Sequence, residues 1–300
     1  MKQILRNLCI VSALLLALTS CDTDAEYTTY SGPNYIMFAD TLFEFPVVTN
    51  GDDYNVEIVA TRACDYDRTL AVEVVDSLSN AIEGRHYSLE SNTVVIKAGE
   101  LVGKVQVKGY HDNIAVTDSL GFALRLITSV DTQWDTYGVE TNVLLKKACK
   151  FDINAFTGPC FIALSTYLQN YTNVDGRLTY SVVDPESENT IIIKDYFYDG
   201  YDCKVKFTTN DILNPLIKFE DQPFGPTAEA FGTLYGEEGI INMYQPSMYT
   251  SYYSSCEKFI LQYMTLYVPS MAYPNTVGVF VNAVEWISED EAEKLRREGY

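Results

Sequence analysis

The sequence predicts an all-β protein, with an N-terminal antiparallel β-sandwich followed by a C-terminal antiparallel β-barrel or sandwich. Short runs of alternating apolar and polar residues recur along the chain and are divided by turns rich in Gly, Asp, Asn and Pro. In the first half these runs recur roughly every ten residues, as in β-sandwich domains. The second half is rich in aromatic residues, which favour strands; the whole chain holds 23 Tyr and 14 Phe.

The N-terminus carries an export signal. Lys2 and Arg6 precede an apolar run over residues 10–18, which is too short for a membrane-spanning helix of ~20 residues. Residues 1–20 are therefore expected to be a signal peptide. Leu18-Thr19-Ser20-Cys21 resembles the lipobox of bacterial lipoproteins, which implies cleavage before Cys21 and lipidation of that residue. The alternative is an ordinary secretory signal that is followed by a Cys by coincidence.

Residues 21–30 are predicted to form a lipidated tether. Asp22, Asp24 and Glu26 resemble the acidic surface-export signal of Bacteroidetes-type lipoproteins. This resemblance implies a lipid-anchored protein of the outer membrane, displayed at the cell surface. A solvated acidic linker is the alternative. No later apolar run reaches spanning length, so the N-terminal lipid is the expected contact with the membrane.

The composition argues against several classes of function. The formal net charge of −20 repels phosphate backbones, so nucleic acid is not an expected partner. The chain has only two His and lacks G-x-S-x-G, H-E-x-x-H, P-loop and G-x-G-x-x-G motifs. We therefore expect no catalytic residues, no cofactor and no metal site.

Five cysteines remain once Cys9 leaves with the signal and Cys21 is lipidated. They show no C-x-x-C spacing, so neither a zinc ribbon nor a thioredoxin-like site is indicated. Free buried thiols are the leading interpretation. One bridge in the C-terminal part, between Cys160 and Cys256, stays open as an alternative. The five are Cys64, Cys149, Cys160, Cys203 and Cys256.

Residues 31–148 are predicted to form the sandwich, of Calx-β or immunoglobulin-like type with about seven strands. The expected strands are 55–58, 70–74, 93–96, 102–108 and 122–126, with 142–145 as an additional edge strand.

Several motifs in this part resemble the Calx-β-like modules at the N-termini of many Bacteroidetes surface lipoproteins. They are Glu83-Gly84-Arg85-His86-Tyr87, Val94-Val95-Ile96, Ala98-Gly99-Glu100 and Lys104-Val105-Gln106-Val107. Calcium-binding members carry acidic clusters after the last strand, where this chain has Tyr110-His111-Asp112-Asn113. Because Ca²⁺ needs six to eight oxygen ligands, the resemblance does not extend to calcium binding.

A basic segment, Lys146-Lys147-Ala148-Cys149-Lys150, indicates a domain boundary near residue 150 and also suits an edge strand. Residues 149–287 are predicted to form an aromatic-rich, barrel-like domain, whose opening Phe156-Thr157-Gly158 and successive hairpins resemble lipocalin-like barrels. Residues 288–300 are predicted to form a short polar helical tail with Ser288 as N-cap. Expected strands of the domain are 178–182 and 190–193 as a hairpin, then 203–207, 232–235, 239–244, 259–268 and 277–284.

Two tyrosine clusters and one tryptophan are the candidate ligand-binding residues. Tyr196, Tyr198 and Tyr201 lie beside three acids, Asp195, Asp199 and Asp202; the alternative is an aromatic-rich turn with solvated acids. Tyr252 and Tyr253 end a predicted exposed loop over 244–253, and rings of this kind suit stacking on sugars or contact with proteins. They could equally close one end of a barrel core. Trp134 is either a stacking platform or an ordinary packed residue.

Three functions follow from these patterns. The first is a non-catalytic surface lipoprotein that binds a glycan or another nutrient beside a TonB-dependent transporter. The second is a structural or adhesive protein-interaction lipoprotein. The third is a carboxylate-dependent glycoside hydrolase that uses Asp195, Asp199 or Asp202, since the two acids of such an enzyme need no local spacing.

Overall fold

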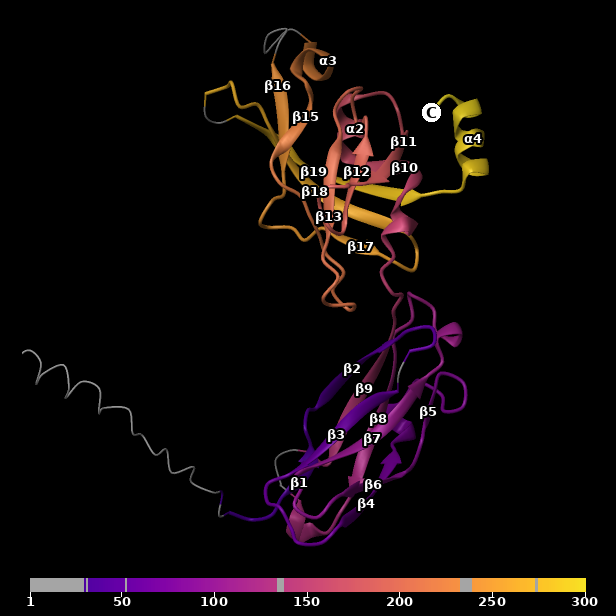
Figure 1. Ribbon diagram of the computed structural model, residues 1–300, viewed down its shortest axis with the longest axis vertical. Coiled ribbons are helices and arrows are strands. Elements are labelled where there is room, and N and C mark those ends of the chain that lie inside the picture. The colour runs from indigo at the N-terminus through magenta and orange to yellow at the C-terminus, as the bar shows by residue number, and fades with distance from the viewer. Residues whose placement is uncertain (1–29, 31, 52, 134–137, 233–238, 273–274) are drawn as a thin grey trace, which may run out of the picture.

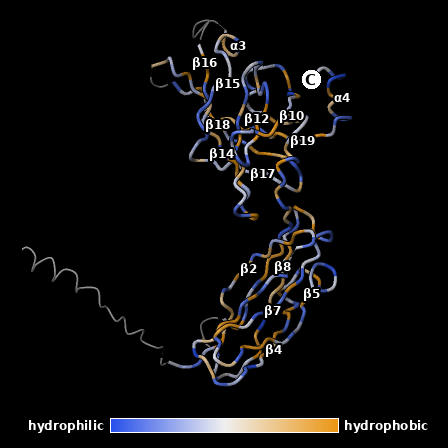
Figure 2. Tube along the Cα trace, in the orientation of Figure 1, coloured by the Kyte–Doolittle hydropathy of each residue, from blue (hydrophilic) through white to orange (hydrophobic). Residues whose placement is uncertain are grey.

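The structure, a computed structural model, describes residues 30, 32–51, 53–133, 138–232, 239–272 and 275–300. These residues form two β-rich bodies, an N-terminal and a C-terminal domain, joined by the segment that follows residue 147 (Figure 1). Each domain has its own apolar core, drawn from residues 36–145 and 156–286 respectively. Figure 2 shows apolar residues concentrated along the strands of both domains. The predicted all-β class is confirmed. Within the described ranges, no helix is both long and apolar enough to span a bilayer.

The N-terminal domain is a sandwich of two sheets. Alternation along each strand directs every second residue into the space between the sheets, as for Val105 and Val107. One sheet has the order β1-β3-β7-β5 and the other β2-β9-β8-β4-β6. The strands are β1 (Ile36–Phe38), β2 (Leu42–Val47), β3 (Tyr54–Ala60), β4 (Arg68–Val74), β5 (Tyr87–Leu89), β6 (Thr93–Ile96), β7 (Val102–Gly109), β8 (Leu120–Ile127) and β9 (Glu140–Lys147).

The sandwich is mainly antiparallel, as predicted, but it differs from the expectations in the place of β9 and in one strand pairing. Strand β9 is not at an edge, because β2 pairs with it on the side away from β8. The β2–β9 pairing is parallel, so the sandwich is not purely antiparallel. Phe45 and Val47 of β2 point into the core, and Pro46 between them is compatible with an edge strand. Lys146 and Lys147 therefore do not protect a sheet edge.

The C-terminal domain is one strongly curved sheet. Its path runs β14-β13-β12-β11-β10-β19-β18-β16-β15, and β17 pairs with β18 beside β16. The strands are β10 (Gly158–Ser165), β11 (Arg177–Val183), β12 (Thr190–Lys194), β13 (Cys203–Phe207), β14 (Ile217–Lys218), β15 (Gln222–Pro226), β16 (Ile240–Tyr244), β17 (Tyr252–Ser254), β18 (Phe259–Tyr267) and β19 (Thr276–Trp286).

One end of this curved sheet is joined to β17, which makes the domain resemble a half-barrel. A bridge joins Leu216, beside β14, to Tyr252 of β17. The Gln222 side chain accepts from the Lys204 amide at 2.8 Å and donates to its carbonyl at 3.1 Å. A side-chain amide thus satisfies backbone groups of β13 where strand pairing ends.

A buried polar network crosses the inside of this curved sheet. The Tyr196 hydroxyl donates to Gln262 Oε1 at 2.6 Å, and Asn282 Nδ2 donates to the same oxygen at 3.4 Å. Ser165 Oγ donates to Asn282 Oδ1 at 2.7 Å and accepts from the Leu168 amide as the N-cap of a short helix. All four side chains are at most 1% exposed, so their polar groups depend on one another.

Helices are short and lie around the sheets. The described α-helices are α2 (Thr166–Tyr171), α3 (Thr227–Phe231) and α4 (Glu289–Glu298), and the 3₁₀ turns are η1 (Asp76–Leu78), η2 (His111–Asn113), η3 (Val130–Thr132) and η4 (Ile153–Phe156). The predicted N-cap of α4 is confirmed, since Ser288 Oγ accepts from the Glu291 amide at 3.3 Å. The predicted hairpin β11–β12 is confirmed by its antiparallel register. Most of the strand predicted over 232–235 falls outside the described residues.

Two of the five cysteines are not free thiols, contrary to the leading interpretation. Cys149, in the inter-domain segment, forms a disulfide with Cys256, in the turn between β17 and β18. Cys160 and Cys203 are free thiols inside the C-terminal core, and Cys64 is a partly buried free thiol. The alternative Cys160–Cys256 bridge is wrong, because Cys160 faces the core and Cys256 is bonded to Cys149.

Candidate functional site

The outward face of β18 carries a row of large apolar side chains. On β18 this row consists of Phe259, Tyr263 and Tyr267, whose side chains all point away from the core. We call this surface the tyrosine platform and define it by Tyr244, Tyr249, Tyr252, Phe259, Tyr263 and Tyr267.

Strand register places these residues on one face. Tyr252 of β17 lies opposite Leu261, and Tyr244 of β16 lies opposite Thr265, both at outward positions of β18. On the other side, Val279 of β19 is paired with Thr265 and is 48% exposed. Phe259 and Tyr267 are eight residues apart, which corresponds to about 27 Å along a strand. The platform is therefore long enough to contact several units of an extended ligand.

The aromatic rings lie in three pairs along the strand. Tyr249 and Tyr263 are stacked, with centroids 5.0 Å apart and planes inclined by 16°. Tyr244 meets Tyr267 edge to face at 5.6 Å, and Tyr252 meets Phe259 in the same way at 6.1 Å. Such contacts fix the ring orientations before any ligand arrives.

A buried serine fixes the loop that carries Tyr249. Ser251 Oγ accepts from the Tyr263 amide at 2.9 Å and donates to the Tyr263 carbonyl at 3.5 Å. The Ser251 carbonyl accepts from the Ile217 amide at 3.1 Å. Ser251 is fully buried, whereas Tyr249, two residues earlier, is 47% exposed. The loop is thus attached to β18 at the residue on which Tyr249 stacks.

The platform has a polar group at one end and a cavity at the other. The Asp221 carboxylate accepts from the Tyr267 hydroxyl and from Asn242 Nδ2 at 2.9 Å, and its bond to Tyr267 raises the pKa of that tyrosine. At the far end, Tyr252 and Phe259 also line a cavity of about 730 Å³, which Lys146 and Lys150 border. Aromatic faces flanked by hydrogen-bonding groups can bind a ligand that is apolar on its faces and polar at its edges.

The structure separates Tyr196, Tyr198 and Tyr201. Tyr196 is 1% exposed and belongs to the core network, so the expectation that it contacts a ligand is wrong. Tyr198 is half-buried and lines a separate hollow of about 310 Å³, with its hydroxyl 2.5 Å from that of Tyr167. Tyr201 is half-buried, and its backbone closes the turn by bonding to Tyr196 and Tyr198. They do not share one surface.

Of the other residues predicted from the sequence, one lies on the platform, one lies in the core and two lie outside the described residues. Tyr252 lies on the platform and is 39% exposed. Tyr253, its neighbour, points the other way; it is 3% exposed and donates to the Thr208 carbonyl at 3.1 Å, so a ligand-binding role for it is wrong. Trp134 and Cys21 lie outside the described residues.

The carboxylates of the three acids beside Tyr196 are engaged by backbone amides of the turn and by neighbouring basic side chains. Asp195 Oδ1 accepts from the Gly200 amide at 2.6 Å, and Asp195 adopts a left-handed backbone with φ +46°, which Asp tolerates. Asp202 accepts from the Asp195 amide at 3.1 Å and from Lys194 at 2.6 Å. Asp199, almost fully exposed, pairs with Arg177 at 3.0 Å. These contacts favour a structural role for the three carboxylates over a catalytic one.

Sequence reasoning missed Tyr263 and Tyr267. The strand over 259–268 is predicted, but its outward residues are not recognised as a surface. A signal was present: both alternating faces of Phe259-Ile260-Leu261-Gln262-Tyr263-Met264-Thr265-Leu266-Tyr267 are mainly apolar or aromatic. Only one face of a barrel strand can fill the core, so the other must expose its aromatic rings.

A protein-family model described as "Domain of unknown function (DUF4984)" matches residues 136–298, more than half of the chain. The chain belongs to the DUF4984 family. The matched region includes the whole tyrosine platform and both cysteines of the disulfide. No curated protein shows a significant match.

Several solved structures are similar to this DUF4984 protein at low identity. The apo-form Calx CBD1 domain is 13% identical with a TM-score of 0.32, over 39% of this chain and 98% of its own. A protein of unknown function from Bacteroides ovatus is 10% identical with a TM-score of 0.35, over 87% and 93%. An auxiliary nutrient binding protein from Bacteroides thetaiotaomicron is 14% identical with a TM-score of 0.32, over 82% and 90%.

Proposed function

We propose that this DUF4984 protein binds a glycan, without catalysis, on the tyrosine platform. The observation that carries the proposal is the row of outward-facing rings along β18, with Tyr244, Tyr249 and Tyr252 each more than a third exposed. Exposed aromatic residues gathered on one sheet face are uncommon unless they bind something. Pyranose rings present C–H groups to an aromatic face and hydroxyl groups to its rim, where Asp221 and Asn242 lie.

Two features of the site favour an extended glycan chain over a single sugar. The platform is open, so it does not enclose a small ligand as a deep pocket would. Its aromatic pairs are distributed along the strand, so successive sugar units can stack on successive rings. The carboxylates considered for glycoside hydrolysis, those of Asp195, Asp199 and Asp202, are held by the turn and by cations, which favours binding without catalysis.

The finer parts of the proposal concern location and partners. We place the protein at the outer-membrane surface, anchored through lipid on Cys21, where it would hold glycans beside a TonB-dependent transporter. Metabolic labelling with a fatty acid tests the anchor, since label should enter the wild type and not Cys21→Ser. Co-purification of a transporter from outer membranes tests the partner.

Affinity gel electrophoresis against a panel of soluble polysaccharides tests the proposed function. At least one polysaccharide should retard the wild type, and a Tyr244→Ala/Tyr249→Ala variant should bind it about tenfold more weakly or worse, since each ring contributes about 1 kcal/mol. The matched control is Tyr180→Ala, which removes a 48% exposed tyrosine from β11. If no polysaccharide retards the protein, or if only the control variant loses binding, the platform is not the glycan site and the adhesive function takes its place.

A further inference from the structure

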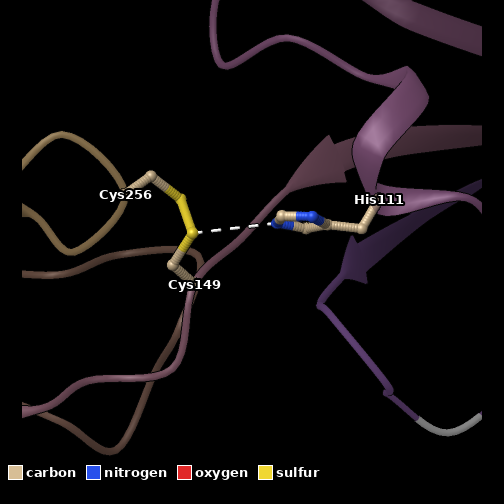
Figure 3. A group of neighbouring side chains, drawn as sticks. All are labelled: His111, Cys149 and Cys256. Atoms are coloured by element: carbon tan, nitrogen blue, oxygen red, sulfur yellow. Dashed lines mark hydrogen bonds between the residues drawn. A yellow bond between two sulfur atoms is a disulfide. The ribbon is translucent and has the colours of Figure 1, made fainter.

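A second site lies between the two domains, where Cys149 and Cys256 line the cavity that borders one end of the platform. His111 comes from η2 of the sandwich, Cys149 from the inter-domain segment, and Cys256 from the turn between β17 and β18 (Figure 3). Nitrogen and both sulfur atoms of this group lie within 4.8 Å of one another. Three residues from separate parts of the chain therefore converge on one point.

The imidazole of His111 is oriented toward the sulfur atoms. Its Nδ1 lies 2.9 Å from Asp112 Oδ1 and 3.0 Å from Thr49 Oγ1. An ionised carboxylate only accepts hydrogen bonds, so in the neutral imidazole this contact favours the tautomer with the proton on Nδ1 and the lone pair on Nε2. Nε2 lies 3.8 Å from Cys149 Sγ, and Figure 3 draws this contact as a dashed line. A histidine held by a carboxylate on its other nitrogen is the usual arrangement of a metal ligand.

We propose that reduction of the Cys149–Cys256 disulfide creates a Zn²⁺ site made of these two cysteines and His111. A dithiol reductant supplies two electrons and two protons, the S–S bond breaks into two thiols, and the reductant becomes a disulfide. Zn²⁺ then displaces both thiol protons and binds two thiolates and Nε2. Water or an external ligand takes the fourth position.

The geometry and the charge suit this ion. A tetrahedral Zn²⁺ with Zn–S of about 2.3 Å and Zn–N of about 2.0 Å holds its ligand atoms roughly 3.5–3.8 Å apart. The spacing of Nε2 and Cys149 Sγ already approaches this range, so binding mainly requires the two sulfur atoms to separate. Two thiolates neutralise the ion, and the thiolate–imidazole set favours Zn²⁺ over Ca²⁺ or Mg²⁺.

The two forms of the site connect different parts of the molecule. The disulfide joins the inter-domain segment to the C-terminal domain only. The metal form would also bind His111, and so would connect the sandwich directly to the C-terminal domain. A reducing environment that contains zinc would thereby restrict the motion between the domains.

Metal titration of the full-length protein tests the proposal. After reduction with a phosphine, which does not compete as a thiol ligand, Co²⁺ should bind one to one with a thiolate charge-transfer band, and Zn²⁺ should displace it. The oxidised protein should bind neither ion. His111→Ala should weaken binding at least tenfold, Cys149→Ser and Cys256→Ser should abolish the band, and Cys64→Ser should leave it unchanged.

Circular dichroism of each variant shows whether it is folded, so that lost binding is not attributed to unfolding. Asp112→Asn gives a milder test, since it keeps all three ligands and should weaken binding without abolishing it. The proposal is overturned if the reduced wild type binds no metal, or if His111→Ala and Cys149→Ser bind the metal as tightly as the wild type does.

Discussion

Tyr249 lies flat against Tyr263, with ring centroids 5.0 Å apart, although one residue belongs to a loop and the other to β18. The hydroxyl of Ser251, which bonds both backbone groups of Tyr263, fixes the loop in this position. A single buried side chain thus couples the geometry of the exposed surface to the sheet beneath it.

Ser251→Ala should destabilise the C-terminal domain by about 1–3 kcal/mol, because the buried amide of Tyr263 loses its acceptor. Denaturant unfolding measures the change. Ser247→Ala, at an exposed position of the same loop, is the control and should stay within about 0.5 kcal/mol of the wild type. Equal stability of both variants would show that Ser251 does not fix the loop.

Tyr196→Phe should cost about 1–3 kcal/mol of stability, since Gln262 Oε1 loses the donor that lies 2.6 Å away inside the core. Its glycan affinity should equal that of the wild type, because Tyr196 is buried beneath the sheet. Chemical unfolding and affinity gels measure the two effects. A variant with intact stability and weakened glycan binding would contradict the core assignment.

Stability should depend on pH through Asp184. The Lys204 ammonium, 2.9 Å away, and the Glu186 amide, at 3.0 Å, hold the pKa of this carboxyl below its usual range. A lowered folded-state pKa stabilises the protein fully above the unfolded value of about 3.9, and this contribution disappears as the pH falls through the folded-state pKa.

Asp184→Asn removes the charge and retains an acceptor for the Glu186 amide. Unfolding followed from pH 7 to pH 2 should show the wild type more stable than the variant at neutral pH, with the difference shrinking in acid. A difference that stays constant, or grows toward low pH, would exclude a stabilising role for the Asp184–Lys204 pair.

Cys256→Ser should destabilise the protein by about 2–4 kcal/mol, because the disulfide closes a loop between residues 107 apart in sequence. Thermal unfolding without reductant measures this loss. Cys64→Ser, which removes a free thiol, should change the midpoint much less. If the two variants unfold at the same temperature, the cross-link does not stabilise the folded chain.

Strands were predictable where alternation marks one buried face. The expected strand over 203–207 matches β13, whose burial alternates along its length, and 93–96 matches β6. Strand β2 escaped prediction because Pro46 interrupts its pattern, and its parallel partner β9 is about a hundred residues away. Pairings at such a separation, including Cys149 with Cys256, leave no local signal in the sequence.

The aromatic character of the candidate site was predictable from the sequence, but its position on the outward face of β18 was not. The abundance of tyrosine indicates an aromatic surface, and Tyr252 is on it. Tyr196 and Tyr198 are two residues apart, yet one packs in the core and the other lines a hollow, because they lie in the irregular segment between β12 and β13, where strand alternation does not apply. The exposed face of a strand becomes evident only when its neighbours are known.

Isothermal titration with the best polysaccharide, comparing Tyr249→Phe with Tyr249→Ala, tests the central claim most directly. Stacking requires the ring and not the hydroxyl, so the Phe variant should bind like the wild type and the Ala variant about fivefold more weakly. Wild-type affinity in both variants would contradict glycan binding on the tyrosine platform.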